Sequence, residues 1–228
     1  MATKDNLTAA AFVERLGAIG VTDGAHADPY AGIGMGKIFA LAKEFKAMPP
    51  AEIEQLLESD HHPVRVGAVS VMDWQARDRE TPAERRRELF DLYMRRHDRI
   101  DTWDLVDRSA IHVVGEYLVD KPRDILHQLA GSERPMERRT AILSTYAFIR
   151  HGQLDDTFAI SEALVDDPDD LVNKAVGWML REAGKRDQPR LTSFLDAHAK
   201  TMPRVMLRYS IEKLDEADRD RYLVMKRR

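Results

Sequence analysis

Cysteine is absent from the 228-residue sequence, which excludes disulfide bonds and thiolate metal sites and suits a reducing compartment. No apolar run approaches the ~20 residues that a membrane-spanning helix needs. Residues 1–17 lack the basic segment followed by an apolar stretch that marks a secretory signal. We therefore expect a cytoplasmic protein, and a chain of this length with 43% hydrophobic residues can bury a sizeable core.

Positive charge is in slight deficit, because the formal net charge is −4 at pH 7. Basic residues supply most of the non-specific affinity for nucleic acid, so this deficit argues against a DNA partner unless the charge is segregated. Segments 62–79, 135–151, 170–187 and 203–213 together hold thirteen basic and seven acidic residues, a net charge of +6 that leaves −10 for the rest of the chain. This segregation favours one basic face that meets a polyanion.

Alternating strand patterns are also absent, and from Lys37 onward the sequence is typical of α-helices separated by breaks that contain proline. A short helix is predicted over residues 8–16, inside an otherwise irregular N-terminal segment over 1–36. Helices begin near residues 63, 136, 169 and 203, with a further helix from Asp101 between the first two. Helical pairs that recur every thirty to forty residues are typical of an α-solenoid. We predict an all-α fold: one domain over 1–228, with repeats from about 37 to 226, forming a curved superhelix with a concave face.

The stretch 101–117 predicts a helix with its own start signals. Asp101 is a candidate N-cap, and Asp104 suits the positive end of a helix. A buried stripe follows at helical spacing: Val106, Ala110, Val113, Val114, Tyr117 and Leu118. Trp103 and Asp107 are four residues apart and share a face beside this stripe. They are either a packed tryptophan and a solvated aspartate, or an aromatic ring beside a functional carboxylate.

Three of the later helices carry cations outside their buried stripes. These are Lys174, Arg181 and Lys185 on the line of Trp178, then Arg139 and Arg150 on the line of Leu143 and Tyr146, and Arg204 one turn before Arg208. One interpretation is solvated basic faces, with Trp178 lying over a neighbouring helix. Recurrence on equivalent helices favours the other, a track in which cations hold phosphates and aromatic rings stack on bases.

Other candidate sites have weaker signals. His61 and His62 are adjacent but have no clear third metal ligand. Ser109 and Ser144 have no evident histidine and carboxylate partners for nucleophilic catalysis, and Trp74 is interpreted as a packing residue. We therefore predict no metal and no cofactor.

Four segments resemble, in the same order, the DNA alkylation-repair glycosylases built from HEAT-like repeats (the AlkD-like family). They are WDLVDRSAIHVVGEYL, ERRTAILSTYAFIRHG, DLVNKAVGWMLREAGKRD and MPRVMLRYSIEKL. The resemblance covers most of the chain from about residue 56. It implies HEAT-like repeats with a concave DNA-binding face, in a monomer that acts on double-stranded DNA.

The resemblance also implies roles for individual residues. Asp107 matches the principal catalytic aspartate, and Trp103 precedes it by four positions. Arg139 matches the arginine that holds the DNA backbone at the lesion, and Trp178 matches the tryptophan that completes an aromatic cradle. Further DNA contacts are then expected from Lys174, Arg181, Arg150, Arg204 and Arg208.

The implied reaction is hydrolysis of the N-glycosidic bond of positively charged N3- or N7-alkylated purines in duplex DNA, without base flipping. Its chemistry suits these groups, because a cationic base is a good leaving group and a fixed carboxylate stabilises the positive charge that develops on the sugar. Tryptophan faces attract cationic bases. The alternative hypothesis is a non-catalytic HEAT-like module that binds DNA structures or a protein partner.

Overall fold

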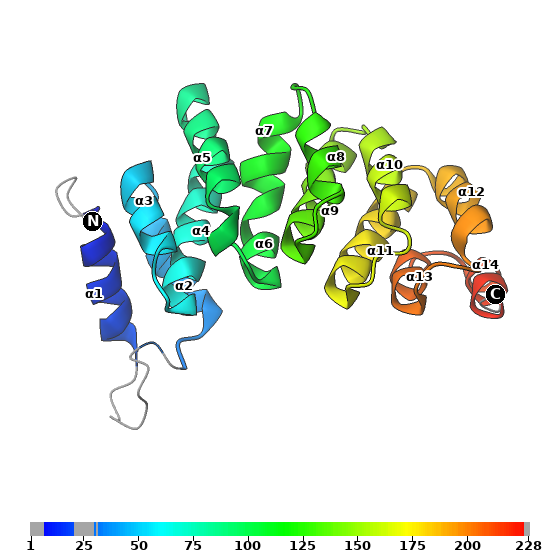
Figure 1. Cartoon of the computed structure of the whole chain (residues 1–228), viewed down its shortest axis with the longest axis horizontal. Coiled ribbons are helices and arrows are strands. Elements are labelled where there is room, and N and C mark those ends of the chain that lie inside the picture. The colour runs from blue at the N-terminus through cyan, green and yellow to red at the C-terminus, as the bar shows by residue number, and fades with distance from the viewer. Residues whose placement is uncertain (1–6, 21–29, 31, 226–228) are drawn as a thin grey trace. The chain divides into compact units, whose positions relative to one another are not determined.

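Every regular element that the structure describes is a helix (Figure 1), which confirms the all-α prediction. The structure is a computed structural model that describes residues 7–20, 30 and 32–225. The chain divides into two compact units, Met1–Tyr117 and Leu118–Arg228. No helix within the described ranges is long and apolar enough to cross a membrane.

The first unit is built around one buried helix, α4. Its elements are α1 (Ala9–Ile19), α2 (Met35–Glu44), α3 (Pro50–Leu57), α4 (His62–Arg77), α5 (Ala83–Arg95), the 3₁₀ turn η2 (His97–Arg99), α6 (Trp103–Ser109) and the π-helix η3 (Ala110–Gly115). Helix α4 packs against α2, α3, α5, α6 and η3. A Cβ atom on its Gly67 would lie 2.3 Å from the Phe12 ring, so only glycine fits there.

The second unit is built around α9 and α11. After α7 (Glu116–Leu118) at the boundary, its helices are α8 (Asp124–Ala130), α9 (Pro135–Arg150), α10 (Asp155–Ala163), α11 (Asp170–Gly184), α12 (Gln188–His198), α13 (Arg204–Ser210) and α14 (Glu216–Leu223). Helix α9 packs on α8, α10 and α11, and α11 also packs on α12 and α13. The backbones of α11 and α13 approach closely, since a Cβ atom on Gly177 would lie 2.6 Å from the Met206 carbonyl oxygen.

The helix starts predicted near residues 63, 136, 169 and 203 are confirmed to within one residue by α4, α9, α11 and α13. Proline occupies the first turn of α3, α4, α9 and α12, where its missing amide costs least. Helix α1 is capped by the Thr8 side chain, which accepts a hydrogen bond from the Ala11 amide. Helix α2 begins at Met35, slightly before the predicted start, while the predicted irregular residues 21–29 lie outside the described residues.

The prediction that Asp101 caps its own helix is wrong. Helix α6 begins at Trp103 after Thr102, and no side chain caps it. The Asp101 carboxylate instead accepts a hydrogen bond from the Arg65 guanidinium of α4, at 3.2 Å. A charged donor from a neighbouring helix makes a stronger bond than the free amides of the first turn, so the tertiary contact prevails. The predicted continuous helix is also divided into α6, η3 and α7.

One local hydrogen-bonding pattern recurs in the loops that lead into α4, α9 and α11. A side-chain oxygen accepts the amide two residues on: Ser59 from His61 (3.2 Å), Ser132 from Arg134 (3.1 Å) and Asp167 from Asp169 (2.9 Å). Six residues later, a side chain donates back to the loop carbonyl: Arg65 to Ser59 (3.0 Å), Arg138 to Ser132 (2.8 Å) and Asn173 to Asp167 (3.1 Å). The same turn is therefore built three times, at intervals of 73 and 35 residues.

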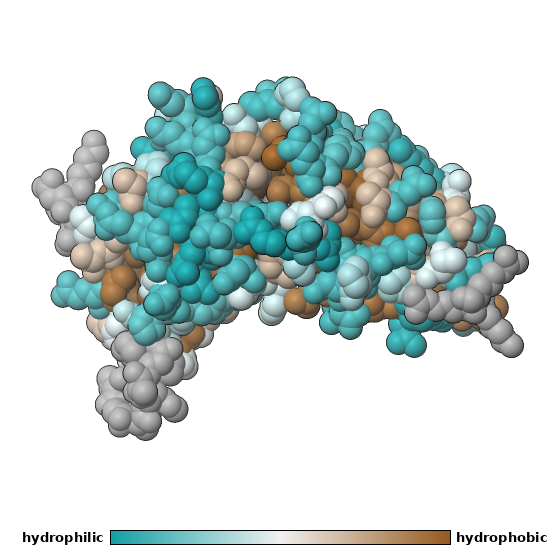
Figure 2. Space-filling model, in the orientation of Figure 1, coloured by the Kyte–Doolittle hydropathy of each residue, from teal (hydrophilic) through white to brown (hydrophobic). Residues whose placement is uncertain are grey.

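The stripe predicted from Val106 to Leu118 is buried, except that Tyr117 is partly exposed. The apolar stripe of α11 is wholly buried and consists of Val172, Ala175, Val176, Met179, Leu180 and Ala183. The apolar face of α9, which includes Ala141, Ile142, Phe148 and Ile149, is buried as well. Figure 2 shows mostly hydrophilic residues on the visible surface, with hydrophobic residues appearing in the gaps between helices. Hydrophobic burial along these stripes is thus the main force that packs the helices of each unit.

Candidate functional site

The start of α6 is held against α4 by the carboxylate of Asp104, which is partly buried. Its Oδ1 accepts a hydrogen bond from the Thr102 hydroxyl at 2.7 Å, and its Oδ2 lies 2.7 Å from His62 Nε2. Burial acts to raise the pKa of the Asp104 carboxyl, but the hydrogen bonds from Thr102 and His62 outweigh it, so the pKa lies below its ordinary value. Together with the bond between Asp101 and Arg65, these contacts fix the first turn of α6.

Trp103 and Asp107 project from this fixed turn. Trp103 is the first residue of α6 and is 51% exposed, which is rare for so large an apolar side chain. Asp107 lies one helical turn further on and is partly buried. The four-residue spacing places both on one face of α6, as predicted. Their arrangement is an exposed aromatic ring beside a carboxylate.

Immediately after α6, the chain widens into the π-helix η3. Ser109 departs from helical geometry at φ −125° and ψ −34°, and its hydroxyl donates to the Leu105 carbonyl at 2.7 Å. Such π-helical turns are rare and often accompany functional sites. Arg108, near the end of α6, and His112, within η3, both contact the same partner, Asp73 of α4. The segment that carries Asp107 is therefore anchored to α4 at both ends.

Asp73 is a buried carboxylate that the sequence reasoning missed. Its side chain is 1% exposed, and its Oδ1 lies 2.7 Å from His112 Nδ1. Its Oδ2 forms ion pairs with Arg108 Nη2 at 3.1 Å and with Arg77 Nη1 at 3.5 Å. Aspartate within an apolar helix face was the only signal in the sequence, and it does not identify partners 35 or more residues away.

In the second unit, Trp178 stands on α11 next to Tyr146 of α9. The ring centroids are 6.2 Å apart and tilted by 37°. Trp178 and Lys174 are both partly exposed, four residues apart on one helix. The structure thus places the Trp178 ring beside a ring of the neighbouring helix α9, with Lys174 one turn before it on α11.

Arg139 is more buried than an arginine that contacts DNA from the protein surface is expected to be. The residue is 5% exposed, and its Nη1 donates to the Leu171 carbonyl at the start of α11. The neighbouring Arg138 forms a buried pair with Asp167, through bonds of 2.6 and 3.1 Å. These two arginines tie α9 to the turn before α11.

The other predicted DNA-binding arginines differ in what they already bind. Arg181 pairs with Glu212 and Glu182, and Arg204 donates to the carbonyls of Leu223 and Met225. Arg150 and Arg208 are exposed, at the end of α9 and on α13. Part of the basic charge predicted for these helices is therefore neutralised within the second unit.

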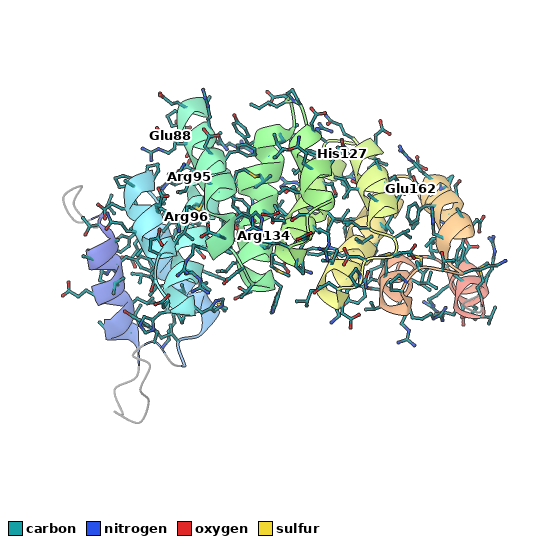
Figure 3. All side chains as sticks on the ribbon, viewed as in Figure 1. Glu88, Arg95, Arg96, His127, Arg134 and Glu162 are labelled. Atoms are coloured by element: carbon teal, nitrogen blue, oxygen red, sulfur yellow. The ribbon has the colours of Figure 1, made fainter. Side chains whose placement is uncertain are left out.

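The outer helices of the first unit are ion-paired in a different way. Arg95 and Arg96 at the end of α5 (Figure 3) pair with Glu54 of α3, and Arg96 also pairs with Glu58. The hydrogen bond that Arg96 donates to Glu58 raises the Arg96 pKa above its ordinary value. Acids match bases here, so this surface has little local excess of charge.

A metal-binding role finds no geometric support in the described part of the chain. His62 is engaged by Asp104, and no group of three or more histidine, aspartate or glutamate side chains has the arrangement of a metal site among the described residues. The candidate functional groups are therefore Trp103 and the Asp107 carboxylate in the first unit and, separately, the aromatic rings and cations of α9, α11 and α13 in the second unit.

The family to which this chain is similar is consistent with the side-chain types described above. An exposed tryptophan, exposed arginines on helices and a carboxylate near a fixed helix start are side chains typical of proteins that act on nucleic acids. The family model described as DNA alkylation repair enzyme matches residues 2–214. The chain belongs to this family, so its partner class is DNA and its role is alkylation repair. A search of curated proteins found no match.

Proposed function

We propose that this protein is a DNA glycosylase that excises positively charged N3- or N7-alkylated purines from duplex DNA by hydrolysing the N-glycosidic bond. The observation that carries the proposal is the position of Asp107, one turn after the 51% exposed Trp103 on a firmly anchored helix start. Both residues come from the WDLVD segment in which the resemblance to the glycosylases is centred.

The proposed mechanism uses the carboxylate of Asp107 and the ring of Trp103. Alkylation places a positive charge on the purine, so the base leaves readily while positive charge develops on the deoxyribose. The Asp107 carboxylate stabilises that charge and orients the attacking water. The face of Trp103 attracts the cationic base and its sugar. No base needs to leave the stack into a pocket, and no metal or cofactor takes part.

The second unit supplies the proposed grip on the DNA. Trp178 and Lys174 present a ring and a cation on one helix, and Arg150 and Arg208 are exposed. We assign backbone contacts to these residues and to Arg181 and Arg204, whose present partners are carboxylates or carbonyl oxygens. Arg139 contacts a phosphate in this proposal by exchanging its bond to the Leu171 carbonyl.

The repeated turn supports HEAT-like repeats as the architecture behind this function. Loops into α4, α9 and α11 use the same two hydrogen bonds at equivalent positions, and these three helices pack on α6, α11 and α13, respectively. Such stacking is how helical repeats bury their apolar stripes and present one face of each second helix to a ligand. We propose a cytoplasmic monomer of this type, acting as a single functional domain on double-stranded DNA.

The direct test is release of methylated purines from alkylated duplex DNA. Wild type should release N3- and N7-methylpurines, and Asp107→Asn should lose at least about 100-fold in rate, as expected when one electrostatic group is removed. Asp91→Asn on α5 is the matched control, because Asp91 is an exposed aspartate in a surface pair. Equal release by Asp107→Asn and wild type would remove Asp107 from the mechanism.

The rival function is non-catalytic binding of DNA structures or of a protein. It is favoured by the internal pairing of Arg181 and the burial of Arg139, which reduce the cations free to meet a lesion. This rival predicts binding of duplex or branched DNA by wild type with no base release, and no effect of Asp107→Asn on that binding.

A further inference from the structure

Trp74 of α4 is surrounded by cations from three helices. Its ring centroid lies 5.1 Å from Lys43 Nζ of α2, 5.2 Å from Arg77 Cζ of α4 and 5.5 Å from Arg108 Cζ of α6. The indole N–H donates to the Phe39 carbonyl at 3.1 Å, which fixes the ring. Because the ring faces are already occupied by cations, Trp74 organises these cations rather than stacking on a base.

Arg108 is the most buried cation of this cluster, and several contacts hold its side chain in place. Its guanidinium lies 4.2 Å from the Phe39 centroid, its Nε donates to the Ser70 hydroxyl at 3.2 Å, and its side chain is only 16% exposed. Burial, followed by repulsion from Arg77, lowers the Arg108 pKa although the nearby Asp73 acts to raise it. The cluster therefore holds a cation in surroundings that do not fully compensate its charge.

The cluster has more positive than negative charge. Lys43, Arg77 and Arg108 face the ring of Trp74, while Asp73 is the one carboxylate paired with them in the described contacts. Lys43 is exposed and the Arg77 side chain is 44% exposed, so both can reach a ligand in solvent. On α3 and α5, by contrast, glutamates match the arginines. A compact set of three cations that share one carboxylate, held around a fixed ring, is complementary to a polyanion.

We propose that Lys43, Arg77 and Arg108 form a phosphate-binding site for the backbone of duplex DNA, located in the first unit and independent of any lesion. Lys43 and Arg77 contact phosphate oxygens, and Arg108 supplies a fixed positive charge beneath them. Such contacts position a protein on DNA without reading its sequence. The site rests on the proposed function only in its choice of DNA as the polyanion, and it assigns no catalytic role to these residues.

The test measures binding of a short undamaged duplex by the full chain at several salt concentrations. The variant Lys43→Gln with Arg77→Gln keeps much of the apolar stems that cover Trp74. The control Arg87→Gln with Lys200→Gln removes the same two charges from exposed positions elsewhere. Each phosphate contact contributes ~0.9 to the slope of log K against log salt, so the site variant should lower the slope by about 2 and the affinity by roughly tenfold or more.

The control should bind nearly as well as wild type. Equal weakening of both variants would show that only net charge matters, and an unchanged site variant would show that the cluster does not touch DNA; either result overturns the proposal. The proposal would also be overturned if inorganic phosphate displaced the duplex at concentrations near the Kd of the duplex, since the ligand would then be a free anion.

Base release from alkylated duplex separates this proposal from the proposed function. The site variant should release methylpurines with an unchanged kcat and a raised KM, because DNA is held less tightly but the chemistry is intact. If wild type releases no base while the site variant still loses affinity and salt dependence, the glycosylase function fails and the phosphate site stands.

Discussion

Asp73 of α4 and His112 of η3 are joined by a 2.7 Å contact between Oδ1 and Nδ1, with the Asp73 side chain 1% exposed. The same carboxylate pairs with Arg108, so one residue holds the end of α6 and the start of the π-helix. Asp107 lies directly before Arg108 in the sequence. The position of the proposed catalytic carboxylate is therefore coupled to a buried contact on another helix.

Removing the Asp73 charge should strongly destabilise the first unit. Asp73→Ala leaves Arg108 and His112 without their partner in a mostly buried position, and breaking a buried pair in this way costs about 3–5 kcal/mol. Thermal or urea unfolding followed by circular dichroism measures the loss. Asp91→Asn, which removes an exposed carboxylate, should change stability by less than about 0.5 kcal/mol. Similar curves for both variants would contradict the role given to Asp73.

Truncating Trp103 should impair base release while leaving the fold intact. The Trp103 ring is half exposed, so Trp103→Ala creates no internal cavity. The unfolding midpoint of this variant should match that of wild type within a degree or two. We expect base release to fall about tenfold or more, since a cation–π contact in a desolvated site contributes up to ~2 kcal/mol. Tyr209→Ala, at another exposed aromatic residue, is the control. A variant with full activity would exclude Trp103 from the site.

Asp104 should make the anchoring of α6 sensitive to acid. Its pKa is lowered in the folded protein below the ordinary value of 3.8, so its stabilising contribution is fully present above that value and is lost as pH falls through the folded pKa. The stability difference between wild type and Asp104→Asn should therefore be constant near neutrality and shrink below about pH 4. Unfolding in urea across pH 2.5–7 gives this difference. A constant difference over that whole range would show that Asp104 is not coupled to Thr102 and His62.

Tyr222 should ionise at a higher pH than an ordinary tyrosine. Burial, followed by the hydrogen bond to Asp196, raises the pKa of Tyr222 to about 12 from 10.0. Neutral Tyr222 is thus favoured by folding, and its contribution is complete below pH 10 and lost as pH rises toward 12. Ultraviolet titration of tyrosinate in wild type and Tyr222→Phe should differ by one group with an apparent pKa near 12. A difference spectrum that titrates near pH 10 would contradict the burial of this hydroxyl.

Gly177 should tolerate no side chain. A Cβ atom there would lie 2.6 Å from the Met206 carbonyl oxygen, so Gly177→Ala forces α11 and α13 apart and costs about 1–3 kcal/mol. Gly36→Ala on α2 is the matched control, because a Cβ atom there meets nothing within 4 Å. This control should be neutral or stabilising by up to ~1 kcal/mol, from helix propensity. Comparable destabilisation by both substitutions would indicate that α11 and α13 pack more loosely.

Local features of the chain were sufficient to predict where several helices begin, although not the division of the helix near Asp101 into α6, η3 and α7. Prolines at the starts of α3, α4, α9 and α12, and the apolar spacing on α9 and α11, depend only on neighbours within a few residues. The shared face of Trp103 and Asp107 follows from the same short-range geometry. The WDLVD and ERR segments also carried the resemblance to the alkylation-repair family, which the family match confirms.

Contacts between helices decided the rest. Arg65 takes the Asp101 carboxylate away from its own helix start, and Arg139 is buried against the Leu171 carbonyl although its spacing suggested a surface cation. Trp74, assigned by its sequence to packing alone, gathers cations from positions 31 and 34 residues away. Helical periodicity predicts on which face of its own helix a residue lies. The burial and the net charge of that face depend on which other helix packs against it.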